Sequence, residues 1–397
     1  MGNDTVGKRA LLGALALVVA ALAGCSGSSE PGATATTEPA AEQTTTSTVA
    51  ADDDLKLNEI QVIGTHNSFH VEAPEDELAQ LAALDAEQAE QRRYTHPDLA
   101  TQLGEQKIRQ LELDVFADAE GGLYADPAFA ASDAESDPAM DEPGTKVLHE
   151  QDVDYHSVCP TLVACLTEVK TWSDANPDHV PVAINIQFKD GPLIFDVPGQ
   201  AVPEKWTTEA MDGLDAEITS VFDEDDIITP DDVRGDHATL NEAVLAKDWP
   251  TLGESRGKVL FLMINPEPYR SIYLEGHDGL DGRILFTNAE PGQPDASYLG
   301  LDDPIADGAR ITELVEQGYL VRTRADANGD DAKADDTTRL DAALASGAQW
   351  VSTDFPGPDG AEEQYGSDYI AELPGFLAAR CNPVSAPKGC DDAAVEP

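Results

Sequence analysis

The chain has 397 residues, of which 41% are hydrophobic and 25% are charged, so it can bury the core of one large domain or two ordinary ones and is not disordered overall. Its 76 acidic residues against 24 basic ones give a formal net charge of −52. That balance argues against nucleic acid, and against anionic lipid bound without help, as partners.

The first segment has the features of an export signal. Lys8 and Arg9 precede the apolar run ALLGALALVVAALAG, which ends in small residues and is too short for a comfortable transmembrane helix. The LAGC at its end resembles a bacterial lipobox. We therefore predict a lipoprotein signal peptide over residues 1–24 and lipidation of Cys25, with a plain cleaved signal peptide as the alternative. Residues 25–54, rich in Thr, Ala and Ser, are predicted to form a flexible tether. The protein is thus expected outside the bacterial cytoplasm, anchored to the cell membrane or secreted.

The four cysteines that follow Cys25 form two close pairs, Cys159 with Cys165 and Cys381 with Cys390. An even number at short spacing in an exported chain predicts two local disulfide bonds. A zinc site is the alternative, but neither pair is a CxxC and no histidine stands at ligand spacing beside them.

From residue 55 onward, strand-like apolar runs alternate with amphipathic segments. The strand-like runs span residues 60–65, 110–116, 180–188, 226–229, 258–265, 283–289, 319–326 and 350–355. Helical spacing is clear in TLVACLTEVKTWSDAN and in DTTRLDAALASGA, which closes with Gly347. About eight such units predict an α/β fold, a single (β/α)8 TIM-type barrel over residues 55–380, followed by a tail over 381–397 that holds the second disulfide. An open doubly wound sheet is the alternative, but no glycine-rich fingerprint follows the first strand.

Polar side chains stand at the carboxyl ends of the predicted strands, which in a barrel converge on one mouth. Glu112 and Asp114 lie on one face of their strand, and two buried carboxylates repel each other unless a cation lies between them. With the amide oxygen of Asn67, which ends the preceding strand, they suit Ca²⁺ or Mg²⁺. The alternative is a pair of salt bridges to Arg322 or Arg324.

Two histidines also end apolar runs, His66 before Asn67 and His149 in TKVLHEQDVDYH. Taken singly, each is more often a hydrogen-bonded structural residue than a catalyst. Near a carboxylate-bound cation, however, two histidines supply the base and the acid that phosphodiester cleavage requires. His156 is close enough in sequence to compete with His149 for the second role.

Four blocks of the sequence, in order between residues 57 and 356, resemble the bacterial Ca²⁺-dependent phosphoinositide phospholipase C family. The blocks are GTHNSFH, QLELDVF, VLHEQDVDYHSVCPTLVACLTEVKTWSDANPDHVPVAINIQFKD and YLVRTRADANGDDAKADDTTRLDAALASGAQWVSTDFP. The resemblance implies that His66 is the general base for the inositol 2-hydroxyl and that His149 is the general acid for the diacylglycerol oxygen. It also implies that Asn67, Glu112 and Asp114 are calcium ligands.

The third predicted strand departs from the family pattern. Members commonly present a glutamate where this chain has Gln187 in IQFK, so this ligand offers an oxygen but one negative charge fewer. The resemblance further implies that Lys189 and Arg322 face the phosphate. Asp354, at the end of the last strand, has two open roles, holding an arginine or touching substrate.

The expected activity is Ca²⁺-dependent cleavage of the glycerol-phosphate bond of phosphatidylinositol-like lipids, giving diacylglycerol and a cyclic or open inositol phosphate. The expected partners are the lipid substrate and, through an N-terminal lipid anchor, a membrane; a monomer is expected. One alternative is a glycerophosphodiester phosphodiesterase on a related barrel, although such enzymes usually open on a His-Arg pair. The other is a non-catalytic lipoprotein that binds phosphorylated polyols.

Overall fold

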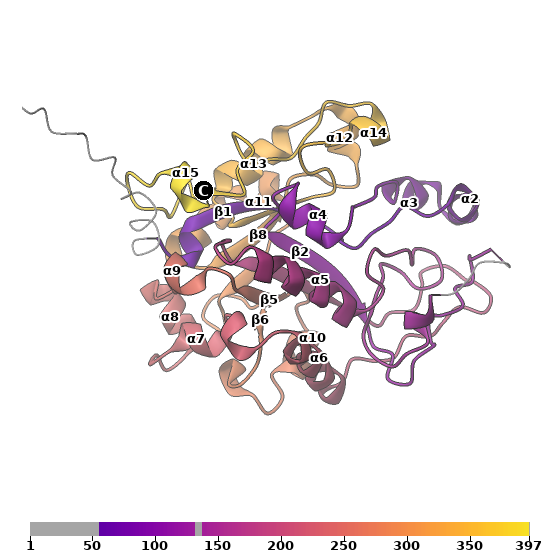
Figure 1. Cartoon of the computed structure of the whole chain (residues 1–397), viewed down its shortest axis with the longest axis horizontal. Helices are drawn as coiled ribbons and strands as arrows, with labels where there is room; N and C mark the ends of the chain where they lie inside the picture. The colour runs from indigo at the N-terminus through magenta and orange to yellow at the C-terminus, as the bar shows by residue number, and fades with distance from the viewer. Residues whose placement is uncertain (1–54, 132–136, 397) are drawn as a thin grey trace, which may run out of the picture. The chain divides into compact units, whose positions relative to one another are not determined.

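The computed structural model describes residues 55–131 and 137–396 (Figure 1). The predicted signal peptide, Cys25 and the predicted tether lie outside the described residues.

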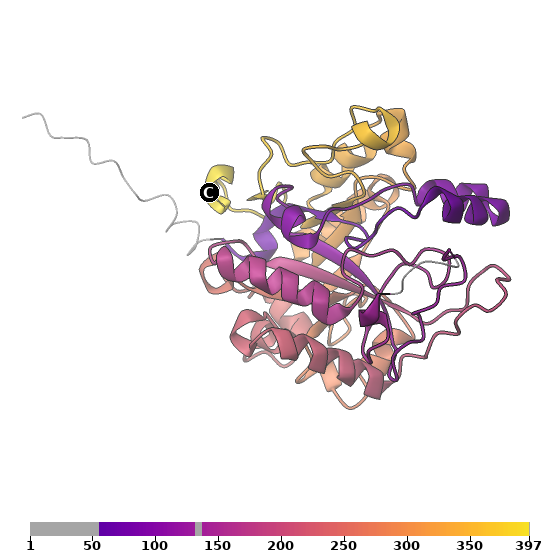
Figure 2. The same ribbon diagram turned by 45° about the vertical axis from the view of Figure 1, so that its right-hand side comes forward.

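Eight parallel strands form the centre of the described structure (Figures 1 and 2). They are β1 (Ile60–Thr65), β2 (Gln110–Phe116), β4 (Val182–Lys189), β5 (Val259–Met263), β6 (Leu285–Thr287), β7 (Tyr298–Gly300), β8 (Leu320–Arg324) and β9 (Trp350–Thr353). The strand order is β6-β5-β4-β2-β1-β9-β8-β7, and a parallel bridge between Asn288 and Tyr298 brings the two outer strands together. The predicted (β/α)8 barrel is therefore confirmed.

Two short antiparallel strands extend this barrel. β3 (Lys146–Val147) pairs with the end of β2, and β10 (Ala379–Cys381) pairs with the start of β1. β1, β2 and β5 are buried along their whole length, as parallel strands covered by helices are. One face of β2 nevertheless carries the polar residues Gln110, Glu112 and Asp114.

Helices surround the strands and fill the connections. The longer ones are α2 (Glu75–Leu84), α5 (Leu162–Ala175), α6 (Thr208–Val221), α8 (Leu240–Ala246), α11 (Pro304–Gln317) and α13 (Thr338–Ser346). The short ones are α3 (Ala86–Gln91), α4 (Leu99–Gly104), α7 (Pro230–Arg234), α9 (Leu252–Ser255), α10 (Tyr269–Tyr273), α12 (Asp330–Ala334), α14 (Glu362–Tyr365) and α15 (Asp392–Val395). α5 and α13 confirm the two helices predicted from spacing, and Gly347 ends α13 in the left-handed conformation. No helix in the described residues is long and apolar enough to span a membrane.

One strand prediction is wrong, and one strand of the barrel was not predicted. Residues 226–229 make only a single bridge, from Ile227 to Val259, and then lead into α7. Ile227 and Ile228 are buried beside Val259, at the start of β5. Their apolar character therefore reflects packing against the barrel rather than an extended strand. The missing strand is β7, whose three residues are too few to give a periodic signal.

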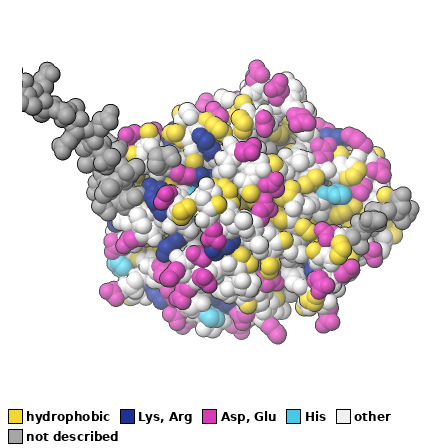
Figure 3. Space-filling model, in the orientation of Figure 1, with side chains coloured by type: hydrophobic (Ala, Val, Ile, Leu, Met, Phe, Trp, Pro, Cys, Tyr) yellow, Lys and Arg dark blue, Asp and Glu magenta, His cyan; other side chains and the backbone are white. Residues whose placement is uncertain are grey.

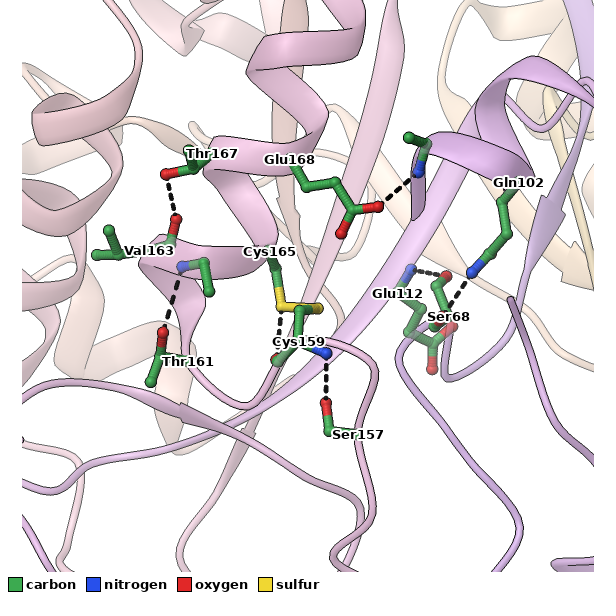
Figure 4. The surroundings of a disulfide bond; sticks show 12 residues. Ser68, Gln102, Glu112, Ser157, Cys159, Thr161, Val163, Cys165, Thr167 and Glu168 are labelled. Carbon is green, nitrogen blue, oxygen red and sulfur yellow. Dashed lines mark hydrogen bonds between the residues drawn. A yellow bond between two sulfur atoms is a disulfide. The ribbon is translucent and has the colours of Figure 1, made fainter. Parts of the chain in front are cut away.

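Both predicted disulfides are present, Cys159 with Cys165 and Cys381 with Cys390. Figure 4 shows the first of them at the start of α5, where Thr161 Oγ1 accepts the N–H of Ala164 as the N-terminal cap. The disulfide therefore joins the first turn of α5 to the segment that follows β3.

The connections after β1, β2 and β4 are long and lie at the carboxyl ends of the strands. Figures 1 and 2 show α2 and α3 projecting on the same side as the loops after β2. Leu81, Phe129, Val153 and Val197 form a small apolar cluster among these connections, apart from the main core. These loops thus pack on one another and build a separate layer over the mouth of the barrel.

Gly64 in β1 is predicted to be indispensable for the barrel interior. A Cβ atom at Gly64 would lie 2.0 Å from Gln110 Oε1 and 2.7 Å from Gln110 Cβ. Since Gln110 Oε1 accepts a hydrogen bond from Ser352, Gly64→Ala forces this side chain out of its place. We expect the substitution to lower the free energy of unfolding by about 2 kcal/mol, measured by urea denaturation.

Gly213→Ala is the matched control, because nothing lies within 4 Å of a Cβ at this position in α6. We expect it to be neutral or to stabilise by about 0.5 kcal/mol. Equal stabilities of the two variants would contradict a tight contact at Gly64.

Candidate active site

A cavity of about 280 Å³ lies at the carboxyl ends of β1 and β9. It is lined by His66, Asn67, Gln88, Gln91, Arg92, Tyr94, His149, Glu150, Arg324, Asn328 and Asp354. Both candidate catalytic histidines and one candidate calcium ligand therefore share one cavity. The lining is polar and contains groups of both charges, which suits a polar ligand.

His66 directly follows β1, and its backbone N–H donates to Thr353 O at 2.9 Å, so the end of β9 fixes its position. Its Nδ1 lies 2.7 Å from Asp354 Oδ1. When the ring proton is on Nδ1 and is donated to Asp354, the other nitrogen, Nε2, accepts an N–H from Arg324 at 3.3 Å. Burial, and then the positive charge of Arg324, lower the pKa of His66. The ring is therefore neutral near pH 7 and has a basic nitrogen, as a general base needs.

Asn67 has a backbone φ of +45°, a left-handed conformation that asparagine tolerates better than most residues. Its Nδ2 donates to the hydroxyl of Tyr94 at 2.9 Å. Its Oδ1 is buried and has no hydrogen-bond partner among the described residues. An amide oxygen fixed in this way, and left unpaired, is a suitable ligand for a hard cation.

His149 is held by a second buried carboxylate. Its Nδ1 lies 2.7 Å from Asp154 Oδ2, while His70 Nε2 lies 3.0 Å from the other oxygen of Asp154. Arg92 Nε completes the group at 2.9 Å. Burial raises the pKa of Asp154, but the charges and hydrogen bonds of His70 and His149 outweigh it and hold that pKa well below its usual range. Asp154 is therefore an anion that fixes the orientation of His149.

The two carboxylates on β2 each face a basic side chain. Glu112 forms an ion pair with Arg322, and its other oxygen lies 3.8 Å from His66 Nε2. Asp114 Oδ2 lies 3.0 Å from Lys189 Nζ. Burial lowers the pKa of Lys189, but Asp114 raises it above its ordinary value, so the Lys189 ammonium is charged. The salt-bridge alternative from the sequence is thus realised at Glu112, through Arg322.

The donor set nevertheless fits Ca²⁺. Asn67 Oδ1 and Asp114 Oδ1 are both buried without a hydrogen-bond partner in the described structure. Gln187 is the strand neighbour of Asp114, and Asn185, also unpaired in its side chain, is the neighbour of Glu112. No group of three or more His, Cys, Asp or Glu side chains suited to a metal occurs among residues 55–131 and 137–396. The predicted ligand set, Asn67, Glu112, Asp114 and Gln187, has two carboxylates and two amides and stays a prediction.

The structure distinguishes residues between which the sequence could not decide. His156 bonds to Glu77 and lines a different cavity, whereas His149 lies with His66. Arg322 is only 2% exposed and is paired with Glu112 and Asp302. Arg324, two residues later on the same strand face, lines the cavity instead.

Asp354 and Asp154 are the residues whose roles sequence reasoning did not assign. Asp354 holds both His66 and Arg324, and Asp154 holds His149. The only signal for Asp154 is its place five residues after His149, in HEQDVD. Spacing alone does not show that the loop turns back on itself there.

A known protein family matches most of the chain. A family model described as "Phosphoinositide phospholipase C, Ca2+-dependent" matches residues 55–383. No curated protein matches the chain.

Solved structures are similar at low identity. A calcium-dependent phosphoinositol-specific phospholipase C from Pseudomonas sp. is 16% identical, with a TM-score of 0.49, over 84% of this chain and 97% of that one. A Ca²⁺-dependent phosphatidylinositol-specific phospholipase C from Streptomyces antibioticus is 19% identical, with a TM-score of 0.47, over 76% of this chain and 95% of that one. Because these values are low, the family assignment rests on the family model.

Buried His96 predicts a pH dependence of stability. Its Nε2–H donates to His66 O at 3.0 Å, and burial lowers its pKa from 6.5 to about 4. The unfolded chain therefore binds this proton first, and His96 destabilises the fold as the pH falls below 6.5. We expect His96→Gln to lose about 2 kcal/mol less stability than wild type between pH 7.5 and pH 5.

Urea unfolding at the two pH values measures this difference. The quantity compared is the loss of unfolding free energy between pH 7.5 and pH 5. An effect of the substitution that is equal at both pH values therefore cancels. Parallel losses in the two proteins would show that His96 does not titrate as described.

Proposed function

Because the chain belongs to the Ca²⁺-dependent phosphoinositide phospholipase C family, we propose that it cleaves the glycerol-phosphate bond of phosphatidylinositol-like lipids, releasing diacylglycerol and a cyclic inositol phosphate. One observation carries this proposal. His66 and His149 line the same cavity, and a buried carboxylate holds Nδ1 of each ring. Two fixed imidazoles on one cavity can take a proton from a nucleophile and give one to a leaving group.

In the first part of the reaction, His66 Nε2 takes the proton of the inositol 2-hydroxyl while that oxygen bonds to phosphorus. Asp354, 2.7 Å from Nδ1, stabilises the positive charge that this transfer places on the ring. Arg324 now contacts the same Nε2, and its guanidinium can exchange that contact for a phosphoryl oxygen. The nucleophile belongs to the substrate itself, so its attack is effectively unimolecular and gives a cyclic product.

In the second part, the bond from phosphorus to the glycerol oxygen breaks. His149 gives a proton from Nε2 to that oxygen, while Asp154 holds Nδ1 and keeps the ring in place. His70 and Arg92 hold Asp154 from its other sides. The leaving group thus departs as neutral diacylglycerol.

When bound, Ca²⁺ supplies positive charge that eases deprotonation of the hydroxyl and stabilises the phosphoryl oxygens. Asn67, Glu112, Asp114 and Gln187 would hold it. Lys189, released from Asp114, would then face the phosphate. Arg322 is held by Asp302 as well as by Glu112, so we propose that it acts there mainly by its charge.

The two disulfides indicate an extracytoplasmic location. We further propose that a lipid on Cys25 anchors the protein to the cell membrane and that the enzyme acts as a monomer. Cys25 lies outside the described residues.

Release of water-soluble inositol phosphate from phosphatidylinositol vesicles tests the activity. We expect release that depends on added calcium and stops with chelator. His66→Ala is expected to lower the rate by about 100-fold or more, because the general base is lost.

His156→Ala is the matched control, since this histidine lies outside the cavity, and is expected to keep at least half the rate. No release by the wild type at any calcium concentration would contradict the proposed function. Equal loss in both variants would contradict the special role of His66.

Gln187→Glu is expected to strengthen calcium binding by about tenfold, because it adds a carboxylate beside Asp114. Titration calorimetry with CaCl₂ on the purified protein measures this directly, without turnover. Gln317→Glu at the end of α11 adds the same charge on an exposed helix and is expected to leave the affinity unchanged. Unchanged affinity in Gln187→Glu would place the calcium site elsewhere.

A further inference from the structure

Asp326, two residues after β8, is a buried carboxylate that the proposed reaction does not use. Acidic side chains are spread over the visible face of the protein (Figure 3), where water solvates their charges. Asp326, in contrast, is 0% exposed. A carboxylate is tolerated in such a place only where hydrogen bonds or a cation compensate its charge. Its partners therefore show what it holds in place.

The first partners of Asp326 lie at the end of β9. Asp354 donates its backbone N–H to Asp326 Oδ1 at 3.1 Å. Thr353, the last residue of β9, donates its hydroxyl to Asp326 Oδ2, and Thr353 Oγ1 accepts the N–H of Phe355 at 2.9 Å. Asp326 therefore joins the chain after β8 to three consecutive residues at the end of β9.

Arg324 is the second partner. Its Nη2 lies 3.6 Å from Asp326 Oδ1 and donates to Asp354 Oδ2 at 2.9 Å, while its Nη1 donates to His66 Nε2 at 3.3 Å. Burial lowers the pKa of Arg324, but the charges of Asp354 and Asp326 raise it above its ordinary value. One guanidinium nitrogen is thus shared by two carboxylates, and the other reaches the ring of His66.

Tyr369 fixes Asp326 from a further side. The Tyr369 hydroxyl donates to Ala325 O at 2.9 Å and lies 3.5 Å from Asp326 Oδ2. Each oxygen of Asp326 therefore has two polar neighbours, Asp354 and Arg324 at Oδ1, and Thr353 and Tyr369 at Oδ2. The carboxylate cannot turn without losing them.

Asp354 and Asp326 differ in how readily they take a proton. Burial raises the pKa of Asp354, but the charges of His66 and Arg324 outweigh it and hold that pKa well below its usual range. Burial, and then the negative charge of Asp354, raise the pKa of Asp326. Asp354 is therefore the anion beside His66. Asp326 Oδ1 accepts the N–H of Asp354 whether or not Oδ2 carries a proton.

We propose that Asp326 is a positioning residue for His66. It holds the backbone of Asp354 and the guanidinium of Arg324 in the places from which Asp354 fixes Nδ1 of His66 and Arg324 reaches Nε2. This inference rests on the proposed function, in which His66 is the general base. Asp326 does not line the cavity of about 280 Å³, so it acts through these two residues and not on the substrate.

The nitrogen chemical shifts of the His66 ring test the positioning. They are measured by ¹⁵N NMR on the full chain at pH 8, without substrate or calcium, and His66→Gln identifies the signals. We expect the wild type to carry the ring proton on Nδ1, because Asp354 accepts it. In Asp326→Ala, Asp354 loses the bond that fixes its backbone. We expect a larger share of the proton on Nε2, which then cannot accept the proton of a substrate hydroxyl.

Two further variants separate positioning from general destabilisation. Asp326→Asn keeps an oxygen for the N–H of Asp354 and is expected to keep the proton on Nδ1. Asp295→Ala is the matched control, because Asp295 is 1% exposed and accepts the Thr287 hydroxyl at 2.6 Å and Arg270 Nε at 2.8 Å. It does not line the cavity beside His66. We expect it to lose stability, as Asp326→Ala does, without moving the proton of His66.

Initial rates on phosphatidylinositol vesicles give the kinetic counterpart. We expect Asp326→Ala to lower kcat by about tenfold or more at an unchanged KM, because the base is misplaced while the cavity lining is kept. Asp326→Asn and Asp295→Ala are expected to keep at least half of the wild-type kcat.

A wild-type proton position in Asp326→Ala would overturn the proposal, and so would an equal displacement in Asp295→Ala. If Asp326→Ala does not fold, Thr353→Val makes the same test, since it removes one hydrogen bond to Asp326 and keeps the shape of the side chain. A displaced proton in a protein whose wild type releases no inositol phosphate would refute the proposed function and leave the positioning standing.

Discussion

A carboxylate inside a parallel barrel is tolerated only where a cation or several hydrogen bonds compensate its charge. Glu112, Asp114 and Asp354 are all buried, and each faces a basic side chain. Removal of one such base leaves a buried charge uncompensated, at a cost of about 3–5 kcal/mol. The bases at the mouth are therefore part of what allows the barrel to fold with its acidic residues in place.

The ion pairs of Glu112 and Asp114 also affect the proposed calcium site. At this site, the ion would compete with Lys189 for Asp114 and with Arg322 for Glu112, while Asn67 Oδ1 has no competing partner in the described structure. An amide at position 187 instead of a carboxylate would further reduce the negative charge on offer.

The barrel could be predicted because strand-like apolar runs alternate with amphipathic helical segments along the sequence. Strands such as β1, β2 and β5 are buried along their whole length, so segments rich in apolar residues mark them in the sequence. The same rule misled at residues 226–229, which are apolar because Ile227 and Ile228 pack below β5. Residues 298–300 form a strand only because β8 lies beside them, and three residues carry no period of their own.

For the site, strand ends were predictable and loop contacts were not. His66, Asn67 and His149 do share one cavity. His66 and Asn67 follow the parallel strand β1, and His149 follows β3, which pairs with the carboxyl end of β2. Arg324 rather than Arg322 lines the cavity, because Arg322 is paired with Glu112. The partner of His149 depends on a turn within residues 149–154. Residue spacing predicts neither, because the first depends on side-chain pairing inside the barrel and the second on the conformation of a loop.

The chain enters the barrel at the end opposite the mouth. Leu57 N–H bonds to Pro250 O and Lys56 bridges to Thr251, both ahead of β5, whereas His66 stands at the far end of β1. Under the proposed lipidation of Cys25, the anchored segment would therefore join the barrel at the end away from the cavity. The length of chain ahead of Leu55 would then decide whether the cavity can reach the membrane that carries the anchor or only a facing one.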